Sequence, residues 1–384
     1  MCLLAGVAVA LYCWAMLQMH SHQVGWDFPV FYIAAHLPLS SLYDDNAFFK
    51  YWQAHLKPLG VPHWAYYIRP SLFSLPLRPL LHLPYYPALT IWLSSGLAVY
   101  FVAVLALIRR FQLPPSWLIA CAAFFPAIGG IFSGVDNAFY LFAFVAALLL
   151  LERDRERWAG CALALCLCKF YLTLLVPALL IFGKRRRALA TFGIGVGTVF
   201  LVSMSLTPLG DYLEVIVNAP AKTKGAFPVG LRGFSSAIGQ PWYYPVLAVV
   251  VIAVACWLLR VLPIAESLSV AIVGTLLISP YVTWYDSALL VLPTAVICAR
   301  SGFEIRATCI LILTAIPLWT HGGGSNGPIG FMHVGVELLM LSYFAHVGFT
   351  CRRCIAKPLA ADAGAPDARR HRDLAMCPEQ AVRR

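Results

Sequence analysis

Charged residues are scarce in this chain. Asp, Glu, Lys and Arg make up 12% of its 384 residues, whereas 61% are hydrophobic and the mean hydropathy is +0.77. Such a composition is far from that of a soluble globular protein. Apolar stretches recur along nearly the whole length, and one bilayer crossing needs roughly 20 mostly apolar residues. The sequence therefore predicts an all-α polytopic membrane protein, with the lipid bilayer as its first partner.

Cysteine is missing from the two longest polar stretches of the sequence. No Cys lies between positions 20 and 113, or between 169 and 255, so neither stretch can hold an internal disulfide bond. Most of the twelve cysteines fall within apolar runs, where Cys acts as a small hydrophobic residue. Cys351 and Cys354 have a zinc-like spacing, but no second pair lies nearby. No HxxH or DxD pair stands out in the predicted external loops, so no cofactor is predicted and metal dependence stays open.

Acidic residues are fewer than basic ones, 17 against 28, which gives a net charge of +11. The basic residues lie in short turns between apolar runs, so the excess does not indicate a nucleic-acid partner. This distribution is the positive-inside pattern of membrane proteins and predicts that these turns are cytoplasmic. The basic turns are Arg109-Arg110, ERDRER (152–157), KRRR (184–187), Arg260, 300–306 and Arg352-Arg353.

The order of apolar runs and basic turns predicts about twelve spans, with both termini in the cytoplasm. The opening segment, residues 2–19, lacks the basic start and the cleavage site of a signal peptide and is interpreted as a retained first span. Two large loops, 20–83 and 207–244, are then external, and residues 307–319 are predicted to cross outward. Residues 1–356 form the integral membrane domain, and the Ala/Pro/Arg-rich stretch 357–384 is expected to be a disordered basic cytoplasmic tail.

Two central segments need a closer count of crossings. Residues 117–132 are predicted to cross as one helix, and 138–151 to return. The next stretch, 158–187, has basic clusters at both ends, and a single crossing would place one of them outside. An even number of crossings is therefore required. A tight hairpin of two short helices, with Lys169 near its external tip, satisfies this rule.

Several ionisable residues fall near helix ends on the predicted external face. They are Asp27 in GWDF (25–28), Asp136 in SGVDNAF (133–139), Lys169, and Asp286 in SPYVTWYDSALLVLP (279–293). Ionisable side chains at membrane depth are costly and tend to line a cavity or a pathway. Because the predicted topology places all four on one side of the membrane, we expect them to share a site.

Each of these residues also has a purely structural alternative. Asp136, with Asn137, could cap the helix that follows, and Asp286 could cap the span that starts at Ser287. Lys169 could be a snorkelling lysine that reaches the membrane surface. Asp27 could be a capping residue or a partner in a salt bridge within its loop.

The segment 68–84 carries cations that the positive-inside rule does not expect in an external loop. Arg69, Arg78 and His82 lie there, with Pro at positions 70, 76, 79 and 84. So many prolines disfavour a continuous spanning helix, and the segment is predicted to be a broken amphipathic stretch at the membrane surface. Arg side chains there can bind a phosphate through two parallel hydrogen bonds. Snorkelling to lipid headgroups is the alternative.

The order of these motifs resembles glycosyltransferase family 87, the GT-C membrane enzymes that include polyprenol-phosphate-mannose-dependent mannosyltransferases of mycobacteria. The resemblance lies in an early acidic residue followed by FYIAAHLPLSSLYD (31–44), RPSLFSLPLRPLLHLPYYPALTIW (69–92), SGVDNAF, WAGCALALCLCKF (158–170) and SPYVTWYDSALLVLP. It implies a GT-C-like bundle in a bacterial-type plasma (inner) membrane. It also implies that a sugar is moved from a polyprenyl-phosphate carrier on the external, periplasmic face.

The resemblance also implies roles for single residues. Asp27 matches the position of the carboxylate that commonly acts as catalytic base in such enzymes, and a single base with a phosphate leaving group implies inversion at the sugar carbon. Arg69, Arg78 and Lys169 are the candidates for binding the donor phosphate, whose growing negative charge they can stabilise. The candidates for binding or orienting substrate are Tyr32, Asp136, Asn137, Tyr285 and Asp286.

The acceptor and the sugar stay open at this point. The acceptor hydroxyl can belong to a glycolipid, a polysaccharide or another molecule, and mannose is favoured only by analogy with the family. The competing class is a multi-span transporter or flippase of a solute or lipid-linked sugar. No internal repeat is visible in the sequence, and the acids gather on one predicted face, so an enzyme is favoured.

Overall fold

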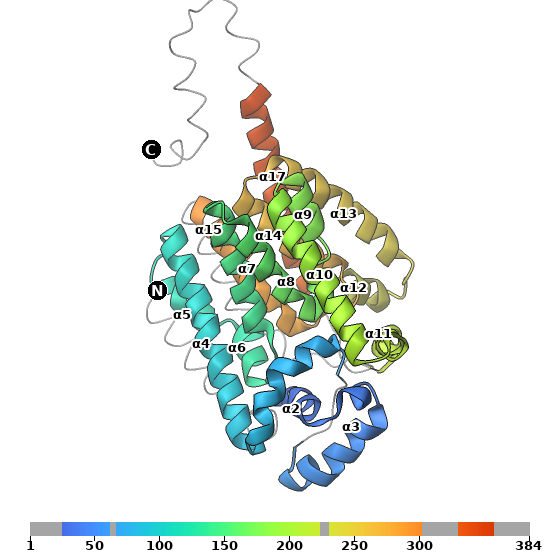
Figure 1. Cartoon of the computed structure of the whole chain (residues 1–384). Helices are drawn as coiled ribbons and strands as arrows, with labels where there is room; N and C mark the ends of the chain where they lie inside the picture. Colours follow the sequence, from blue (N-terminus) through green and yellow to red (C-terminus); the bar gives the residue numbers. More distant parts are fainter. Residues whose placement is uncertain (1–24, 62–66, 223–229, 302–328, 357–384) are drawn as a thin grey trace, which may run out of the picture.

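The computed structural model describes residues 25–61, 67–222, 230–301 and 329–356 (Figure 1). Every regular element within these ranges is a helix. Three predicted segments lie outside them: the first span, the crossing at 307–319 and the cytoplasmic tail. The prediction of an all-α protein is confirmed for the described part of the chain, whereas twelve spans and a GT-C arrangement stay predictions.

Within the described ranges, three helices are long and apolar enough to cross a membrane. They are α4 (Tyr85–Phe111), α10 (Arg186–Leu206) and α13 (Tyr243–Val261). Large apolar side chains are exposed on them, including Ile194, Leu201 and Val249. Water would not favour such a surface, and lipid would. The chain is therefore a multi-pass membrane protein.

Shorter apolar helices fill the interior of the bundle. In α14 (Ile264–Ile278) every residue after the first is buried, because α7 (Asn137–Glu152), α13 and α15 (Val291–Arg300) pack around it together with α17 (Ile329–Ala356). A helix that is apolar on all sides is typical of such a central position. This core fixes the helix ends between which the polar site lies.

One predicted span is wrong as a single helix. Residues 117–132 form two short helices, α5 (Ser116–Ala122) and α6 (Phe125–Phe132), separated by Phe124 in an extended conformation. Pro126 has no N–H to continue the hydrogen bonds of the preceding helix, which explains the break. As a result, α6 is set apart from α5 and ends at the turn that carries Asp136.

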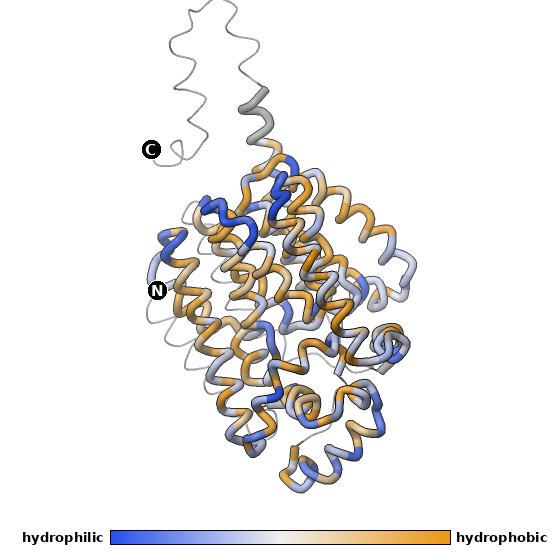
Figure 2. The backbone as a smooth tube through the Cα atoms, in the orientation of Figure 1, coloured by the Kyte–Doolittle hydropathy of each residue, from blue (hydrophilic) through white to orange (hydrophobic). Residues whose placement is uncertain are grey.

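The predicted hairpin is confirmed. It consists of α8 (Glu156–Leu165), the 3₁₀ helix η5 (Cys166–Leu172) and α9 (Val176–Phe182). Its two ends meet, because Arg185 lies 2.8 Å from Asp154 and 3.4 Å from Glu156. Figure 2 shows hydrophilic turns at the top of the bundle. This end carries the basic turns 109–110, 152–157 and 184–187, and we call it the basic end.

The opposite end carries short and irregular helices (Figure 1, bottom). The first loop contains α2 (Phe28–His36), η1 (Leu39–Ser41), α3 (Asp45–Tyr51), the π-helix η2 (Trp52–Leu56), η3 (Lys57–Leu59) and the 3₁₀ helix η4 (Ser71–His82). Pro76 and Pro79 lie inside η4, which is one unbroken 3₁₀ helix of 12 residues and not a spanning α-helix, so the predicted break is not seen. The second loop contains α11 (Leu209–Lys222) and α12 (Leu231–Ala237). A last 3₁₀ helix, η6 (Trp284–Leu290), leads into α15.

Candidate active site

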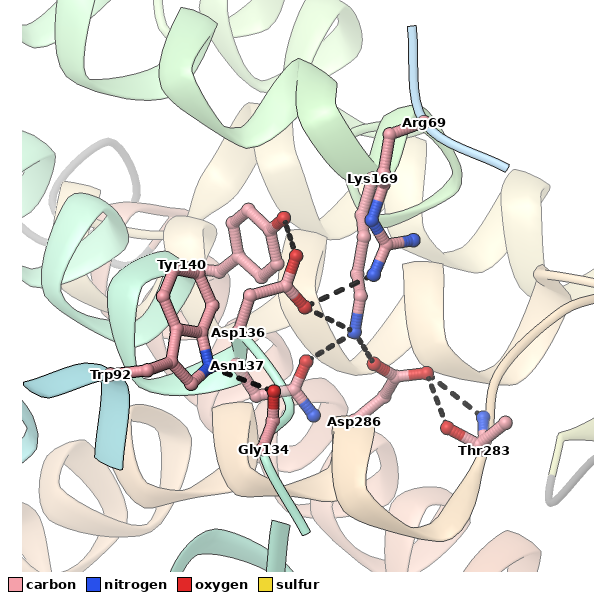
Figure 3. A network of polar contacts seen from close by, with 9 residues as sticks. All are labelled: Arg69, Trp92, Gly134, Asp136, Asn137, Tyr140, Lys169, Thr283 and Asp286. Carbon is pink, nitrogen blue, oxygen red and sulfur yellow. Dashed lines mark hydrogen bonds and ion pairs between the residues drawn. The ribbon is translucent and has the colours of Figure 1, made fainter. Parts of the chain in front are cut away.

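The stretch around Asp27 is fixed to the turn between α6 and α7. The Asp27 backbone N–H donates to the Ser133 carbonyl at 2.7 Å. Gly134 adopts φ +87°, and a Cβ there would lie 2.7 Å from the Cβ of Phe28. Only glycine allows both this conformation and this close approach. Trp92 of α4 donates to the Gly134 carbonyl at 2.8 Å, so three elements hold the turn in place (Figure 3).

Four of the predicted site residues form one buried group of charges, which we call the ion cluster. Lys169 lies 2.9 Å from Asp286 and 3.2 Å from Asp136, and Arg69 lies 3.1 Å from Asp136 (Figure 3). Asp286 lies in η6 and Asp136 in the turn before α7. Lys169 lies in η5, and Arg69 lies in the loop before η4. Positions far apart in the sequence therefore meet, as the predicted topology required.

Lys169 is the centre of the ion cluster. Lys169 is 1% exposed. Its ammonium group donates to Asn137 Oδ1 and also contacts the carboxylates of Asp136 and Asp286. An ammonium has three N–H donors, and three acceptors surround it. The backbone at Lys169 is non-helical (φ −112°, ψ 71°) and turns the side chain into the cluster. The snorkelling alternative is therefore wrong.

Asp286 divides its two carboxylate oxygens between two partners. Oδ1 accepts from Lys169, and Oδ2 accepts from the Thr283 backbone N–H at 2.9 Å and from the Thr283 hydroxyl at 3.0 Å. The Thr283 contacts form a capping box at the start of η6. Asp286 is thus the N3 residue of this capping box and a member of the ion cluster, and not the N-cap of a helix that starts at Ser287, as the structural alternative expected.

Asp136 occupies the N-cap position of α7 but makes no capping hydrogen bond with its side chain. Its carboxylate instead contacts Arg69, Lys169 and the hydroxyl of Tyr140. Burial raises the pKa of Asp136, but the charges of Arg69 and Lys169 outweigh it and lower the pKa to about 2. This carboxylate therefore stays ionised at neutral pH. The capping alternative for Asp136 is wrong.

Asp27 differs from the two carboxylates of the ion cluster. It is partly buried at the N-cap position of α2, makes no side-chain capping bond, and its carboxylate accepts no hydrogen bond from any described residue. Burial raises its pKa to about 6, while the charges of Lys169 and Arg69 lower it and those of Asp136 and Asp286 raise it. Asp27 is thus a carboxylate near the ion cluster, without a bonded partner in the described ranges.

The remaining predicted residues lie around this group. Tyr285 of η6 holds its ring 5.3 Å from the Lys169 ammonium. Tyr32 donates from α2 to the Leu83 carbonyl at 2.9 Å. Arg78 donates to the Leu37 carbonyl at 2.9 Å, which places it at the C-terminal end of α2, whereas Asp27 precedes the first residue of that helix.

Two tyrosines of the site were not expected from the sequence. Tyr140 lies one helical turn after Asp136, a spacing that brings side chains together on a helix and could have revealed it. Tyr67 is 2% exposed, and its hydroxyl has no hydrogen-bond partner in the described ranges. In the same ranges Arg69 Nε and Asn137 Nδ2 are buried donors without a partner as well. Donors in this position can bind the acceptor oxygens of a ligand.

In the described ranges, no three His, Cys, Asp or Glu side chains are grouped so that they could bind one metal ion. The chemistry of the group is instead that of carboxylates, an ammonium, a guanidinium and hydroxyls. One carboxylate can accept a proton near neutral pH, and the cations lie beside it.

Comparisons with known proteins gave one match. The model of glycosyltransferase family 87 matches residues 67–280, which is more than half of the chain. The matched part contains Arg69, Asp136 and Lys169, whereas Asp27 precedes it and Asp286 follows it. No curated protein and no solved structure matches the chain.

Proposed function

Because the chain belongs to glycosyltransferase family 87, we propose that it transfers a hexose from a polyprenyl-phosphate carrier to an acceptor hydroxyl. Mannose is the favoured sugar by analogy with the family. The acceptor is a glycolipid, a polysaccharide or another hydroxyl compound. A lipid-linked donor agrees with a protein whose exposed helix surfaces are apolar, since such a substrate reaches the site from the bilayer.

The observation that carries this proposal is the state of Asp27. An acceptor hydroxyl needs a base as its oxygen attacks the anomeric carbon, and a base works best with a pKa near the operating pH. Asp27 has a pKa of about 6, whereas Asp136 is held at about 2 by its cations. The carboxylate of Asp27 also accepts no hydrogen bond from a described residue, so its oxygens are available to a hydroxyl proton. A single base next to a displaced phosphate gives inversion.

The leaving group of this reaction is a phosphate whose negative charge grows as the bond to the sugar breaks. Preorganised cations beside that charge lower the barrier of the reaction. Arg69, Arg78 and Lys169 remain the candidates for this role. Asp136, Asn137, Asp286, Tyr32 and Tyr285 would then orient substrates or the side chains that bind them.

The charge distribution supports an orientation in the membrane. The basic end would be cytoplasmic by the positive-inside rule, so the irregular opposite end would face the outside of a bacterial-type plasma membrane. The site would act on the external face, within an integral membrane domain of residues 1–356. Reporter fusions after Arg187 and near Asn46 test this orientation, with a cytoplasmic signal expected for the first and an external signal for the second.

The transfer reaction itself is tested with purified protein. It is incubated with a series of radiolabelled polyprenyl-phosphate hexoses and a membrane lipid extract as acceptor, and the product is identified by its mass. We expect one hexose to be transferred in preference to the others. Movement of a lipid-linked sugar across vesicles, without any transfer product from the whole series, would instead favour the flippase alternative.

A further inference from the structure

Two buried donors beside the ion cluster have no partner among the described residues. The hydroxyl of Tyr67 and the Nε–H of Arg69 are both removed from solvent, and neither makes a hydrogen bond within the described part of the chain. A buried polar group without a partner destabilises a folded protein, and a bound ligand often explains its presence. Both groups therefore need an explanation that the ion cluster does not supply.

The two residues that carry these donors lie close together. Tyr43 joins them, because its ring lies 6.3 Å from the Tyr67 ring and its hydroxyl donates to the Arg69 carbonyl at 2.8 Å. Burial raises the pKa of the Tyr67 hydroxyl and the Arg69 charge lowers it, which places the guanidinium within electrostatic reach of the phenol. The Tyr67 hydroxyl keeps its proton and remains a donor. The Tyr212 ring lies 5.4 Å from the Tyr43 ring, so the rings of Tyr67, Tyr43 and Tyr212 pack in a row.

The other two cations differ from Arg69 in their surroundings. Lys169 is surrounded by three acceptors, Asp136, Asp286 and Asn137, which use its three N–H groups. Arg78 donates to a backbone carbonyl at the end of α2. Arg69 binds Asp136 through one terminal nitrogen and keeps its buried Nε–H unused.

We propose that Tyr67 and Arg69 bind the phosphate of the lipid carrier, Tyr67 through its hydroxyl and Arg69 through Nε. A phosphate fits because it supplies several acceptor oxygens and a negative charge beside a guanidinium. Lys169 is then a positioning residue that holds the carboxylates of the ion cluster. This inference rests on the proposed function, since it names the side chains that take the donor's phosphate.

The test separates phosphate binding from sugar transfer. Binding of farnesyl phosphate and of farnesol, which lacks the phosphate, is measured on the purified full-length protein in detergent. We expect the wild type to prefer farnesyl phosphate. The preference should fall about tenfold in Arg69→Lys, which keeps the charge beside Asp136 but removes Nε, and about threefold to tenfold in Tyr67→Phe.

A matched tyrosine provides the control. Tyr100 is also fully buried, but its hydroxyl donates to the Cys121 carbonyl at 2.9 Å. Tyr100→Phe should lower the melting temperature, because it removes an existing hydrogen bond. It should leave the phosphate preference unchanged, because Tyr100 lies in the middle of α4 and not beside Tyr67 or Arg69 in the chain. Tyr67→Phe should do the reverse, since loss of an unpaired buried hydroxyl is neutral or stabilising.

Two results would overturn the inference. One is a wild-type protein that binds farnesol as tightly as farnesyl phosphate. The other is an unchanged preference in both Tyr67→Phe and Arg69→Lys. Neither result bears on whether a sugar is transferred, whereas a phosphate preference without any transfer product would count against the proposed function alone.

Discussion

The two ends of the molecule differ in how they use ion pairs. At the basic end two pairs lie at the surface: Arg110 binds Glu152 through two nitrogens at 2.6 and 2.9 Å, and Arg185 reaches Asp154, whose side chain is 84% exposed. In the ion cluster, by contrast, the Lys169 and Asp286 side chains are at most 1% exposed. Similar charges thus lie in water at one end and are removed from it at the other.

This difference indicates what each set of charges does. Surface ion pairs contribute about 0–1 kcal/mol each, and here they join the ends of neighbouring helices. A buried set has lost the hydration of every member, and its mutual attraction does not reliably exceed that loss. A chain with so few charges that still buries four of them beside Asp27 is better explained by chemistry at the site than by stability.

The largest expected difference comes from removing one cation at each end. Lys169→Met leaves Asp136 and Asp286 buried without their shared partner, so the free energy of unfolding should fall by about 3–5 kcal/mol. Arg110→Met removes a surface pair and should change it by about 1 kcal/mol or less. Thermal unfolding in detergent measures both variants. Equal losses would contradict the comparison.

A smaller effect is expected from pH. The pKa of Asp136 is about 2 in the folded protein and 3.8 for a free side chain, so its ionised form is favoured by folding. This contributes about 2 kcal/mol of stability above the unfolded pKa, which is lost as pH falls through about 2. Unfolding measured from pH 6 to pH 2 should therefore show a loss that is reduced in Asp136→Asn. Parallel curves for the two proteins would sink this assignment.

The smallest effect has the opposite sign. The pKa of Asp27 is raised to about 6, so its contribution to stability is present below about pH 4 and is lost as pH rises through 6. Asp27→Asn removes a carboxylate that folding disfavours. We expect it to raise the free energy of unfolding by about 1 kcal/mol at pH 8, a value discounted because the side chain keeps some solvent contact. A loss of stability at pH 8 would show that Asp27 has a structural partner.

Much of the arrangement could be predicted from the sequence because charge restricts topology. Basic clusters at both ends of 158–187 required a hairpin, and the structure has it. The same topology placed Asp136, Lys169 and Asp286 on one side, where they are in contact. Ionisable side chains are costly to bury in a membrane protein, so few positions are open to them and their location can be predicted.

The details that depend on local backbone and on side-chain contacts could not be predicted. The continuous apolar run at 117–132 suggested one helix, but the effect of Pro126 on the backbone was stronger and separated α5 from α6. The carboxylate of Asp136 turns to Arg69 and Tyr140 instead of capping its helix, a choice set by tertiary neighbours. Tyr67 gave no signal at all, because an unpaired hydroxyl is visible only once its surroundings are known.

The most direct test of the proposal that Asp27 is the general base is the pH dependence of sugar transfer. Turnover is measured from pH 5 to pH 8 for the wild type, Asp27→Asn and Asp44→Asn, since Asp44 is an exposed residue of the same loop that caps α3 through Asn46. We predict a wild-type rate that rises through about pH 6. Asp27→Asn should be slower by about 10²–10⁴-fold and lack this rise, while Asp44→Asn, whose new amide still caps, matches the wild type. Near-normal turnover of Asp27→Asn, with the same rise through pH 6, would contradict the account.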